Sequence, residues 1–266
     1  MVALEIIPLR GGNSQLRNRA ISGTLLALLL IGILALTFDI QKVEAVENVD
    51  ILSDTGFVDS LGFYHIVGEV QNVGDQAVKY VEIIATFYDS SNVVATSFTY
   101  ASLDILLAGS KSPFEVLLFD TVQAAKVNHY SLGVTFSAAN AIPLGLQILS
   151  NDSYTDSLGF VHVVGEIENI GTATATDVKV IATFYNSTGY VVAIAVTSSN
   201  PSNIDSGHIA PFEVLMTYSD REPLVTSYAL TGQSQQYAII PEFPSVVILP
   251  LFIVFTILAI FFKKTH

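Results

Sequence analysis

The middle of this 266-residue chain contains the same sequence twice. Residues 51–95 and 148–193 align almost without a gap. The clearest matches are Leu61–Gly74 with Leu158–Gly171 and Ser112–Leu117 with Ala210–Leu215. A repeat of roughly a hundred residues is too long for a solenoid unit and typical of a whole domain. The sequence therefore predicts two homologous domains in tandem, but the repeat itself names no biochemical activity.

Each copy carries the pattern of a β-strand. Residues 64–70 and 161–167 alternate side chains with period two and are rich in β-branched and aromatic types, which predicts a strand in each copy. The segments Asn72-Val73-Gly74 and Asn169-Ile170-Gly171 follow. Asn and Gly tolerate positive φ, so a turn is expected where each strand ends.

Further strands are expected on both sides of polar connections. They cover 78–88 and 175–185, the runs starting at Val93 and Tyr190, the FEVL segments opened by Pro113 and Pro211, and 128–136 and 226–232. Proline is tolerated as the first residue of a strand, where its missing N–H costs least. A strand, a Gly/Asn-containing turn and a second strand form a hairpin.

Several short strands without helical periodicity predict an all-β fold. We expect two tandem immunoglobulin-like antiparallel β-sandwich domains at 46–138 and 146–236, flanked by N- and C-terminal hydrophobic (transmembrane) helices. The linker 139–145 is short and contains Pro143, so the two domains should swing little against each other.

The two ends of the chain account for its high hydrophobic content of 51%. Residues 21–38 and 245–262 are uncharged runs just long enough, as helices, to cross a bilayer. Basic residues lie in 1–20 and in the tail 263–266. Because positive flanks stay in the cytoplasm, both ends should face inward and the repeats outward. The expected location is the cell membrane, with the repeat domains on the extracellular side.

The first hydrophobic run has a second interpretation. A basic front, an apolar core and the small residues Val43 and Ala45 also fit a signal peptide cleaved after Ala45. The stretch between the core and that site is long and contains Asp39 and Lys42, which favours a retained anchor. The sequence leaves both alternatives open.

The middle of the chain is strongly acidic. Between residues 47 and 240, five basic residues stand against twenty carboxylates. Such a surface repels phosphate backbones and argues against a nucleic-acid partner. Cysteine and tryptophan are absent, so the Cys pair and buried Trp of antibody domains are missing.

Several of the repeated segments resemble those of the FxLYD domain family. The resemblance rests on V-G-E-V/I-x-N-x-G, on a strand ending in F-Y-D/N, and on a later P-F-E-V, and it covers about two thirds of the chain. Ala85 stands where the family has phenylalanine, and Phe87 stands where it has leucine, a swap that preserves core volume. Membership would imply a small extracytoplasmic immunoglobulin-like sandwich of a prokaryotic envelope protein, without established catalytic residues.

The C-terminal tail is similar to the tails of archaeal surface proteins. Pro241, Glu242, Phe243 and Pro244 precede the second hydrophobic run. Related PEF-type tails are thought to be sorting signals cut by an archaeosortase. An ordinary anchor with a proline-rich collar is the simpler interpretation, and we favour it.

The repeated histidines and acidic residues are candidate metal ligands. His65 and His162 precede Glu69 and Glu166 by four residues, which places each pair about 13 Å apart along a strand, too far for one metal. We expect surface imidazoles, and we expect unremarkable roles for two further histidines, His129 and His208. The acidic residues leading into the repeats match no calcium loop and fit turns equally well: Asp50, Asp54, Asp59, Asp152 and Asp156. No metal or cofactor is therefore predicted.

The chain contains two N-glycosylation sequons, Asn151-Asp152-Ser153 and Asn186-Ser187-Thr188. Asn186 lies in an expected hairpin turn, where a glycan would be exposed. The sequence has no G-x-S-x-G, no P-loop, no G-x-G-x-x-G, no H-E-x-x-H and no cysteine nucleophile. We therefore expect a non-catalytic protein.

Three functions remain open. The first is a membrane-anchored surface protein whose sandwiches bind another envelope protein or a polysaccharide. The second is an accessory subunit of a membrane complex, for which small residues such as Gly23 and Gly32 would allow close helix contact. The third, a secreted enzyme or metal carrier, depends only on the acidic loops.

Overall fold

The computed structural model describes residues 48–241. The predicted cleavage site at Ala45, the hydrophobic runs 21–38 and 245–262, and residues 242–244 of the tail motif lie outside this range. Within the described range, no helix has the length and apolar character needed to cross a membrane. The helices there are short: α2 at Thr121–Ala124 and a 3₁₀ turn, η1, at Glu222–Leu224.

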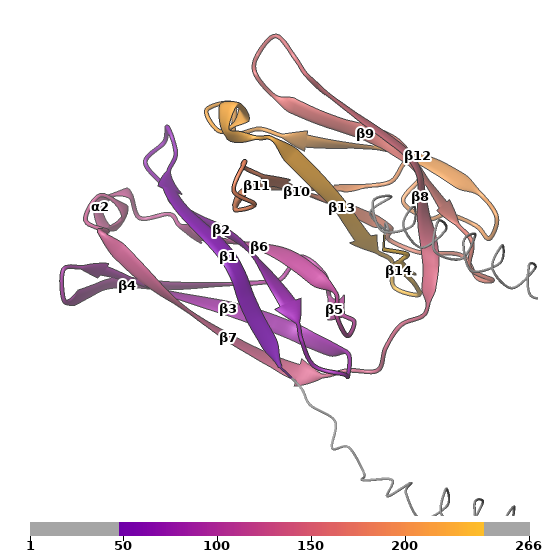
Figure 1. Cartoon of the computed structure of the whole chain (residues 1–266), viewed down its shortest axis with the longest axis horizontal. Coiled ribbons are helices and arrows are strands. Elements are labelled where there is room, and N and C mark those ends of the chain that lie inside the picture. The colour runs from indigo at the N-terminus through magenta and orange to yellow at the C-terminus, as the bar shows by residue number, and fades with distance from the viewer. Residues whose placement is uncertain (1–47, 242–266) are drawn as a thin grey trace, which may run out of the picture. The chain divides into compact units, whose positions relative to one another are not determined.

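The first repeat forms two antiparallel sheets (Figure 1). Its strands are β1 (Val49–Val58), β2 (Tyr64–Asn72), β3 (Val78–Asp89), β4 (Asn92–Tyr100), β5 (Ile105–Leu106), β6 (Lys111–Leu118) and β7 (His129–Ala138). One sheet has the order β1-β2-β6, and the other has β3 at its centre, paired with β4, β5 and β7. We call this unit sandwich 1.

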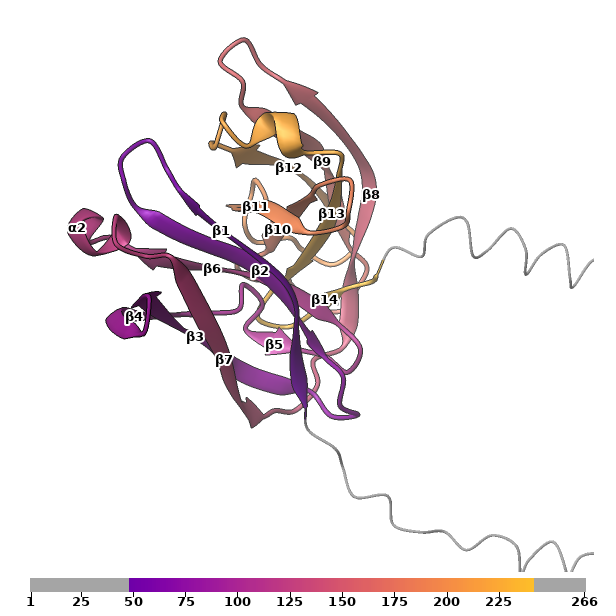
Figure 2. The same cartoon turned by 60° about the vertical axis from the view of Figure 1, so that its left-hand side comes forward.

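The second repeat, sandwich 2, has the same strand pairs but joins them into one sheet. Its strands are β8 (Leu144–Thr155), β9 (Val161–Asn169), β10 (Lys179–Tyr185), β11 (Val191–Ser198), β12 (Ile209–Met216), β13 (Ser227–Gln233) and β14 (Ala238–Ile239). The order is β11-β10-β13-β14-β8-β9-β12. The short β14 makes the connection, because it pairs antiparallel with β13 and parallel with β8 (Figure 2).

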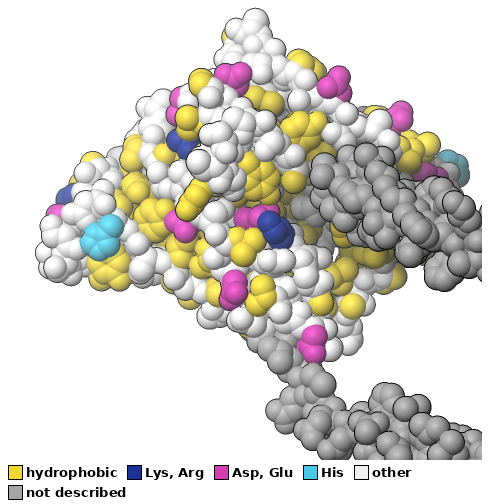
Figure 3. All heavy atoms as spheres, in the orientation of Figure 1, with side chains coloured by type: hydrophobic (Ala, Val, Ile, Leu, Met, Phe, Trp, Pro, Cys, Tyr) yellow, Lys and Arg dark blue, Asp and Glu magenta, His cyan; other side chains and the backbone are white. Residues whose placement is uncertain are grey.

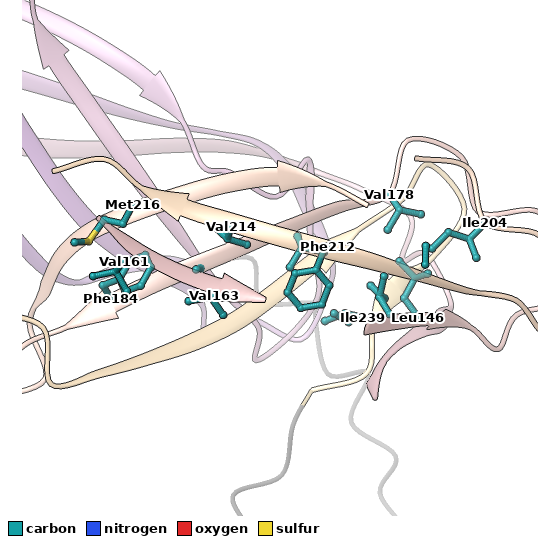
Figure 4. Close-up of a cluster of buried hydrophobic side chains, with 14 of the residues drawn as sticks. Leu146, Val161, Val163, Val178, Phe184, Ile204, Phe212, Val214, Met216 and Ile239 are labelled. Atoms are coloured by element: carbon teal, nitrogen blue, oxygen red, sulfur yellow. The ribbon is translucent and has the colours of Figure 1, made fainter. Parts of the chain in front are cut away.

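Period-two alternation places one face of each sheet in a core. In sandwich 1, alternate residues of β2 and β3 such as Ile66, Ile83 and Phe87 are fully buried in one cluster. In sandwich 2, Val163, Phe184 and further side chains form the equivalent cluster (Figure 4). The predicted all-β fold of packed antiparallel strands is therefore confirmed in its coarse form.

The domain limits differ slightly from the prediction. Strand β8 begins at Leu144, inside the predicted linker. Sandwich 2 extends past residue 236, because Tyr237 and Ile239 belong to its buried core. The Tyr237 hydroxyl also accepts backbone N–H groups of Thr172 and Ala173, so this late segment fastens the loop after β9.

Strands β2 and β9 end at the Asn–Gly segments as predicted, but positive φ is not the reason. None of their residues has positive φ in the structure. Asn72 and Asn169 are instead the last residues of β2 and β9, with fully buried side chains. The Asn72 amide donates to the carbonyls of Gln76 and Leu106 and accepts from Gly74 N–H. Asn169 makes the equivalent three bonds. These amides satisfy buried loop backbone that would otherwise lack partners.

The two prolines also lie elsewhere than predicted. Pro113 and Pro211 are the third residues of β6 and β12, not the first. Each of these strands forms an edge of its sheet, where a missing N–H leaves no gap in a ladder.

Gly68 of β2 gives a direct test of how tightly the strands approach. A Cβ there would meet the ring of Phe114 and would lie 2.5 Å from the carbonyl oxygen of Ser53. We expect Gly68→Ala to lower the free energy of unfolding by about 1–3 kcal/mol, as overpacked cores do. Denaturant unfolding of the full chain in detergent measures this.

Gly133 of β7 is the matched control, since a Cβ there would have nothing within 4 Å. Gly133→Ala should leave stability unchanged or raise it by up to about 1 kcal/mol. Equal losses in the two variants would contradict the close approach at Gly68.

Candidate functional site

A five-residue turn, Asp-Ser-Leu-Gly-Phe, occurs at the same place in both sandwiches. In sandwich 1 the Asp59 carboxylate accepts the backbone N–H groups of Leu61 and Phe63. Gly62 has φ +87°, which favours glycine. Asp156 makes the equivalent bonds in sandwich 2. The turn therefore fixes an aspartate six residues before the histidine of the following strand.

In sandwich 1 this turn places His65 between two carboxylates. The His65 Nδ1 atom lies 2.8 Å from Glu115 Oε1, and its Nε2 atom lies 3.2 Å from Asp59 Oδ2. The second contact has ion-pair distance but lacks the alignment of a hydrogen bond. Phe57, directly opposite on β1, stacks on the imidazole with ring centroids 4.9 Å apart.

Sandwich 2 repeats the arrangement with different burial. His162 Nδ1 lies 2.7 Å from Glu213, and Nε2 lies 3.3 Å from Asp156. Tyr154 stacks on this imidazole at 4.5 Å. The side chain of Glu213 is 54% exposed, against 25% for Glu115.

The interpretation of His65 as a surface imidazole is therefore wrong, because only 3% of the residue is exposed. Its partners are also not the glutamate four residues later but Asp59 and Glu115. Both acids belong to repeated segments, Asp-Ser-Leu-Gly-Phe and Pro-Phe-Glu-Val-Leu. Their repetition was a signal. Sequence spacing alone could not show that a turn and a neighbouring strand bring them to one histidine.

The His65 site is buried because sandwich 2 packs on it. The Tyr218 hydroxyl donates to Glu115 Oε1 at 2.8 Å, and the Tyr218 ring meets Phe57 edge-on. The Arg221 guanidinium lies over the ring of Phe57, 4.2 Å from its centroid. A phenol and a cation from sandwich 2 thus complement a carboxylate and an aromatic ring of sandwich 1.

The contact between the sandwiches extends along β2. Glu69 accepts from the Tyr185 hydroxyl of β10 at 2.7 Å and pairs with Lys111 at 2.9 Å. Val67, which points away from the core of sandwich 1, is fully buried. Ile181 of β10 belongs to the buried cluster of sandwich 1. We call Phe57, His65, Val67, Glu69 and Glu115 the covered face, and Ile181, Tyr185 and Val191 the docking face.

Sandwich 2 has an open counterpart of the covered face. Tyr154, His162, Val164, Glu166 and Glu213 occupy the equivalent positions on β8, β9 and β12, and we call them the open face. None of them is buried, and no described residue of another domain packs over them as Tyr218 packs over His65. Exposed hydrophobic side chains also show elsewhere on the surface (Figure 3).

Charge and burial shift the pKa values of the His65 site. Burial alone lowers the pKa of His65, but the hydrogen bond to Glu115 and the neighbouring Asp59 carboxylate outweigh it, so the pKa lies above its usual value. Burial raises the pKa of Asp59, but bonds from Phe63, His65 and Leu61 outweigh it and lower that pKa. Burial and the Glu115 charge raise the pKa of Tyr218.

At the open face, the hydrogen bond to Glu213 raises the pKa of His162. Both sites therefore favour an imidazolium held between two carboxylates. The arrangement is suited to fixing a turn and an edge strand and to presenting charge to a partner.

A cleft of about 910 Å³ opens beside the covered face. Glu69, Lys111 and Tyr185 supply part of its polar lining, and Leu103 and Ile105 supply part of its apolar lining. Its rim includes Pro241, the last described residue.

The other predicted site residues lie apart from this arrangement. Asp54 accepts from the Tyr130 hydroxyl, Asp50 from Asn48, and Asp152 from Ser153 N–H. His129 stacks on Tyr88, and His208 contacts the Ser206 carbonyl. Among residues 48–241, no group of three or more His, Cys, Asp or Glu side chains is arranged to hold a metal ion.

The two sequons differ in their surroundings. Asn151 lies exposed in β8, and its side chain accepts from the Tyr228 hydroxyl. Asn186 begins the β10–β11 turn, where its oxygen accepts from Thr188 and Tyr190 N–H. Glycosylation of both stays a prediction.

Comparisons with known proteins leave the chain without an assigned family. No family model and no curated protein matches it. Solved structures with a similar arrangement include the exo-chitosanase CsxA of Amycolatopsis orientalis, at 10% identity over 71% of this chain and a TM-score of 0.28. Others are red sea bream transglutaminase, at 6% over 75% and 0.23, and Bacteroides uniformis β-glucuronidase 2, at 11% over 73% and 0.24. The match spans 26%, 32% and 31% of those proteins, respectively.

Tyr218 provides a test of the contact between the sandwiches. Tyr218→Phe removes the donor to Glu115, and we expect a loss of about 1–2 kcal/mol in the free energy of unfolding. Denaturant unfolding of the full chain measures it. Tyr190, exposed at the β10–β11 turn, is the matched control, and Tyr190→Phe should change stability by less than about 0.5 kcal/mol. Equal free energies of unfolding for Tyr218→Phe and Tyr190→Phe would contradict a stabilising role of the Tyr218 hydroxyl.

The pH dependence tests the charge state of His65. A raised pKa in the folded state means that its stabilising effect is fully present below the unfolded value of about 6.5 and is lost as pH rises through the folded value. Thermal unfolding of the full chain should therefore show stability falling as the pH rises above about 6.5. The charged and titratable groups that face this imidazole are Asp59, Glu115, Tyr218 and Arg221.

His65→Gln should remove much of this alkaline loss. His162→Gln, at the more exposed site, should remove less. The same pH slope in the wild type and in His65→Gln would show that His65 does not cause the loss.

Proposed function

We propose that this chain is a non-catalytic, membrane-anchored surface protein that displays two immunoglobulin-like β-sandwiches for binding another envelope protein or a glycan. The anchor and the outward orientation rest on the hydrophobic runs and their basic flanks. The repeated strand patterns and the proline-rich tail agree with an envelope location.

The open face is the observation that carries the proposal. Its histidine, flanking acids and stacked aromatic ring reproduce the geometry that, at the covered face, meets another protein domain. A surface whose duplicate is a protein contact, and which is itself uncovered, is suited to receive a partner. This favours a protein ligand over a glycan.

The contact between the sandwiches supports a binding role in a second way. Buried Val67 and Ile181 and the hydrogen bonds of Glu69 and Glu115 hold the two domains together. A partner would therefore meet a surface that is already ordered, which reduces the entropy lost on binding.

Display can be tested with single cysteines, because the natural chain has none. Ser187 is exposed in the turn after β10, and Thr265 lies in the predicted cytoplasmic tail. In intact cells, a membrane-impermeant maleimide should label Ser187→Cys, whereas Thr265→Cys should be labelled only after permeabilisation. Protection of Ser187→Cys in intact cells would refute surface display.

Binding is tested with the full chain purified from its native membranes. Glu213→Lys reverses a charge on the open face. This variant should bind less of any protein or glycan that occupies that face. Asp50→Lys, a reversal at an exposed position of β1 in sandwich 1, is the control. A ligand that both variants retain equally would place binding elsewhere.

A further inference from the structure

Each sandwich has one face of the covered type and one of the docking type, so the chain carries four such faces. The covered face of sandwich 1 and the docking face of sandwich 2 meet inside the chain. The open face of sandwich 2 and the equivalent of the docking face on sandwich 1 have no described partner domain. The two unused faces are therefore of complementary types.

The unused docking-type face lies on β3 and β4. Ile84 and Tyr88 occupy the positions of Ile181 and Tyr185 in the repeat. Across the strand pair, Ile84 lies opposite Phe98, and Tyr88 lies opposite Val93. We call these four residues the free docking face.

The free docking face has the character of an interaction surface. Phe98 is 60% exposed and Val93 is 59% exposed, whereas Val191, opposite Tyr185 in sandwich 2, is fully buried. Neighbouring Tyr100 adds a third large exposed side chain. Val191, the duplicate of Val93, is covered by sandwich 1, whereas Val196, the duplicate of Phe98, is 52% exposed. Exposed apolar side chains on a sheet face are costly in water, and Val93 and Tyr88 lie where the duplicate makes its contact.

The open face matches the covered face contact by contact. At the covered face, Glu69 accepts a hydrogen bond from the Tyr185 hydroxyl. In the repeat, Glu166 is the equivalent of Glu69, and Tyr88 is the equivalent of Tyr185. Val164 stands where Val67 is buried against sandwich 2. Both partners of the hydrogen bond and the apolar group beside it therefore exist on the unused faces.

We propose that copies of this chain associate head to tail, with the free docking face of one copy seated on the open face of the next. This rests on the proposed function, and it identifies the envelope partner as a second copy of the chain. The contact is heterologous, because two different surfaces meet, so it leaves one face of each type free at the ends and allows rings or filaments.

The association between copies is weaker than the contact within the chain. The free docking face lacks the polar groups of sandwich 2, because Asp120 and Gln123 replace Tyr218 and Arg221. Glu82 likewise replaces Lys179, which pairs with Asp104 within the chain. The Asp120 carboxylate accepts backbone N–H groups of Val122 and Gln123 at the start of α2, which partly satisfies it beside an acidic surface. Within the chain, the short linker also supplies a high effective concentration. Between copies, confinement to one membrane raises the effective concentration.

Crosslinking in native membranes tests the proposal with the full, otherwise cysteine-free chain. One tagged copy carries Tyr88→Cys, and a differently tagged copy carries Glu166→Cys. A short thiol-specific crosslinker should give a mixed dimer from this pair. Replacing Glu166→Cys by Ser187→Cys, which is exposed on the other side of sandwich 2, should abolish it. Asp104→Cys with Lys179→Cys in one chain calibrates the reaction, because these side chains already meet.

A second variant confirms the face. Val93→Ser removes an exposed side chain whose duplicate Val191 is buried, so the fold should survive, and the yield of mixed dimer should fall roughly tenfold. No mixed dimer above the Ser187→Cys control, while the calibrating pair reacts, would overturn the proposal. So would a dominant Tyr88→Cys self-dimer, which requires a symmetric contact, or a yield unaffected by Val93→Ser.

The two proposals fail separately. Labelling of Ser187→Cys in intact cells without a mixed dimer would leave surface display intact and remove self-association. Protection of Ser187→Cys would refute display whatever the crosslinking result.

Discussion

The imidazole of His65, held between Asp59 and Glu115, lies at the centre of the arrangement of the two sandwiches. A buried ion pair contributes little to stability unless further hydrogen bonds satisfy its lone pairs. Here the turn backbone satisfies Asp59, and Tyr218 of the second sandwich satisfies Glu115. The site in one domain is thus completed only by the other. This dependence ties the folding of β2 and its turn to the docking of sandwich 2, and it explains how a short linker without cysteines can join two domains in a fixed relation.

The same polar group has two different uses in the two copies. In sandwich 1 the imidazole of His65, its acids and Phe57 are removed from water by sandwich 2. In sandwich 2 the equivalent groups meet solvent, where high dielectric weakens each charge pair. Retention of a three-residue polar arrangement at an exposed position, where a simple turn would need only Asp156, is unexplained by stability alone. Binding of a partner that excludes water there would strengthen the same contacts.

Much of the fold could be predicted because it depends on local rules. Period-two alternation and the repeat predicted most of the strands, the two sandwiches and their approximate limits. The predictions that failed concern groups whose partners are distant in sequence. Asn72 resembled a turn residue because nothing local shows that Leu106 supplies the carbonyl it must satisfy. His65 resembled a surface residue because alternation placed it opposite the core, and sequence cannot show that a second domain covers that side. The strands β1 and β8 were missed because Asp50, Asp54 and Asp152 fitted turns, although the structure places them within strands. The strands β5 and β14 were missed because two residues carry no readable period.

Duplication explains why the chain has unused faces, and divergence sets how strongly they can act. Two copies of a domain with one face of each type always leave one of each free. Identical copies would associate without limit, since each added copy would recreate the same pair of faces. In this chain the loops after β6 and β12 have diverged, and only the second carries Tyr218 and Arg221. The strong polar contacts are therefore confined to the pairing within the chain, while the apolar and Tyr–Glu positions are shared by both. Loop divergence of this kind weakens the contact between copies without removing it, so that association depends on how many copies share the membrane.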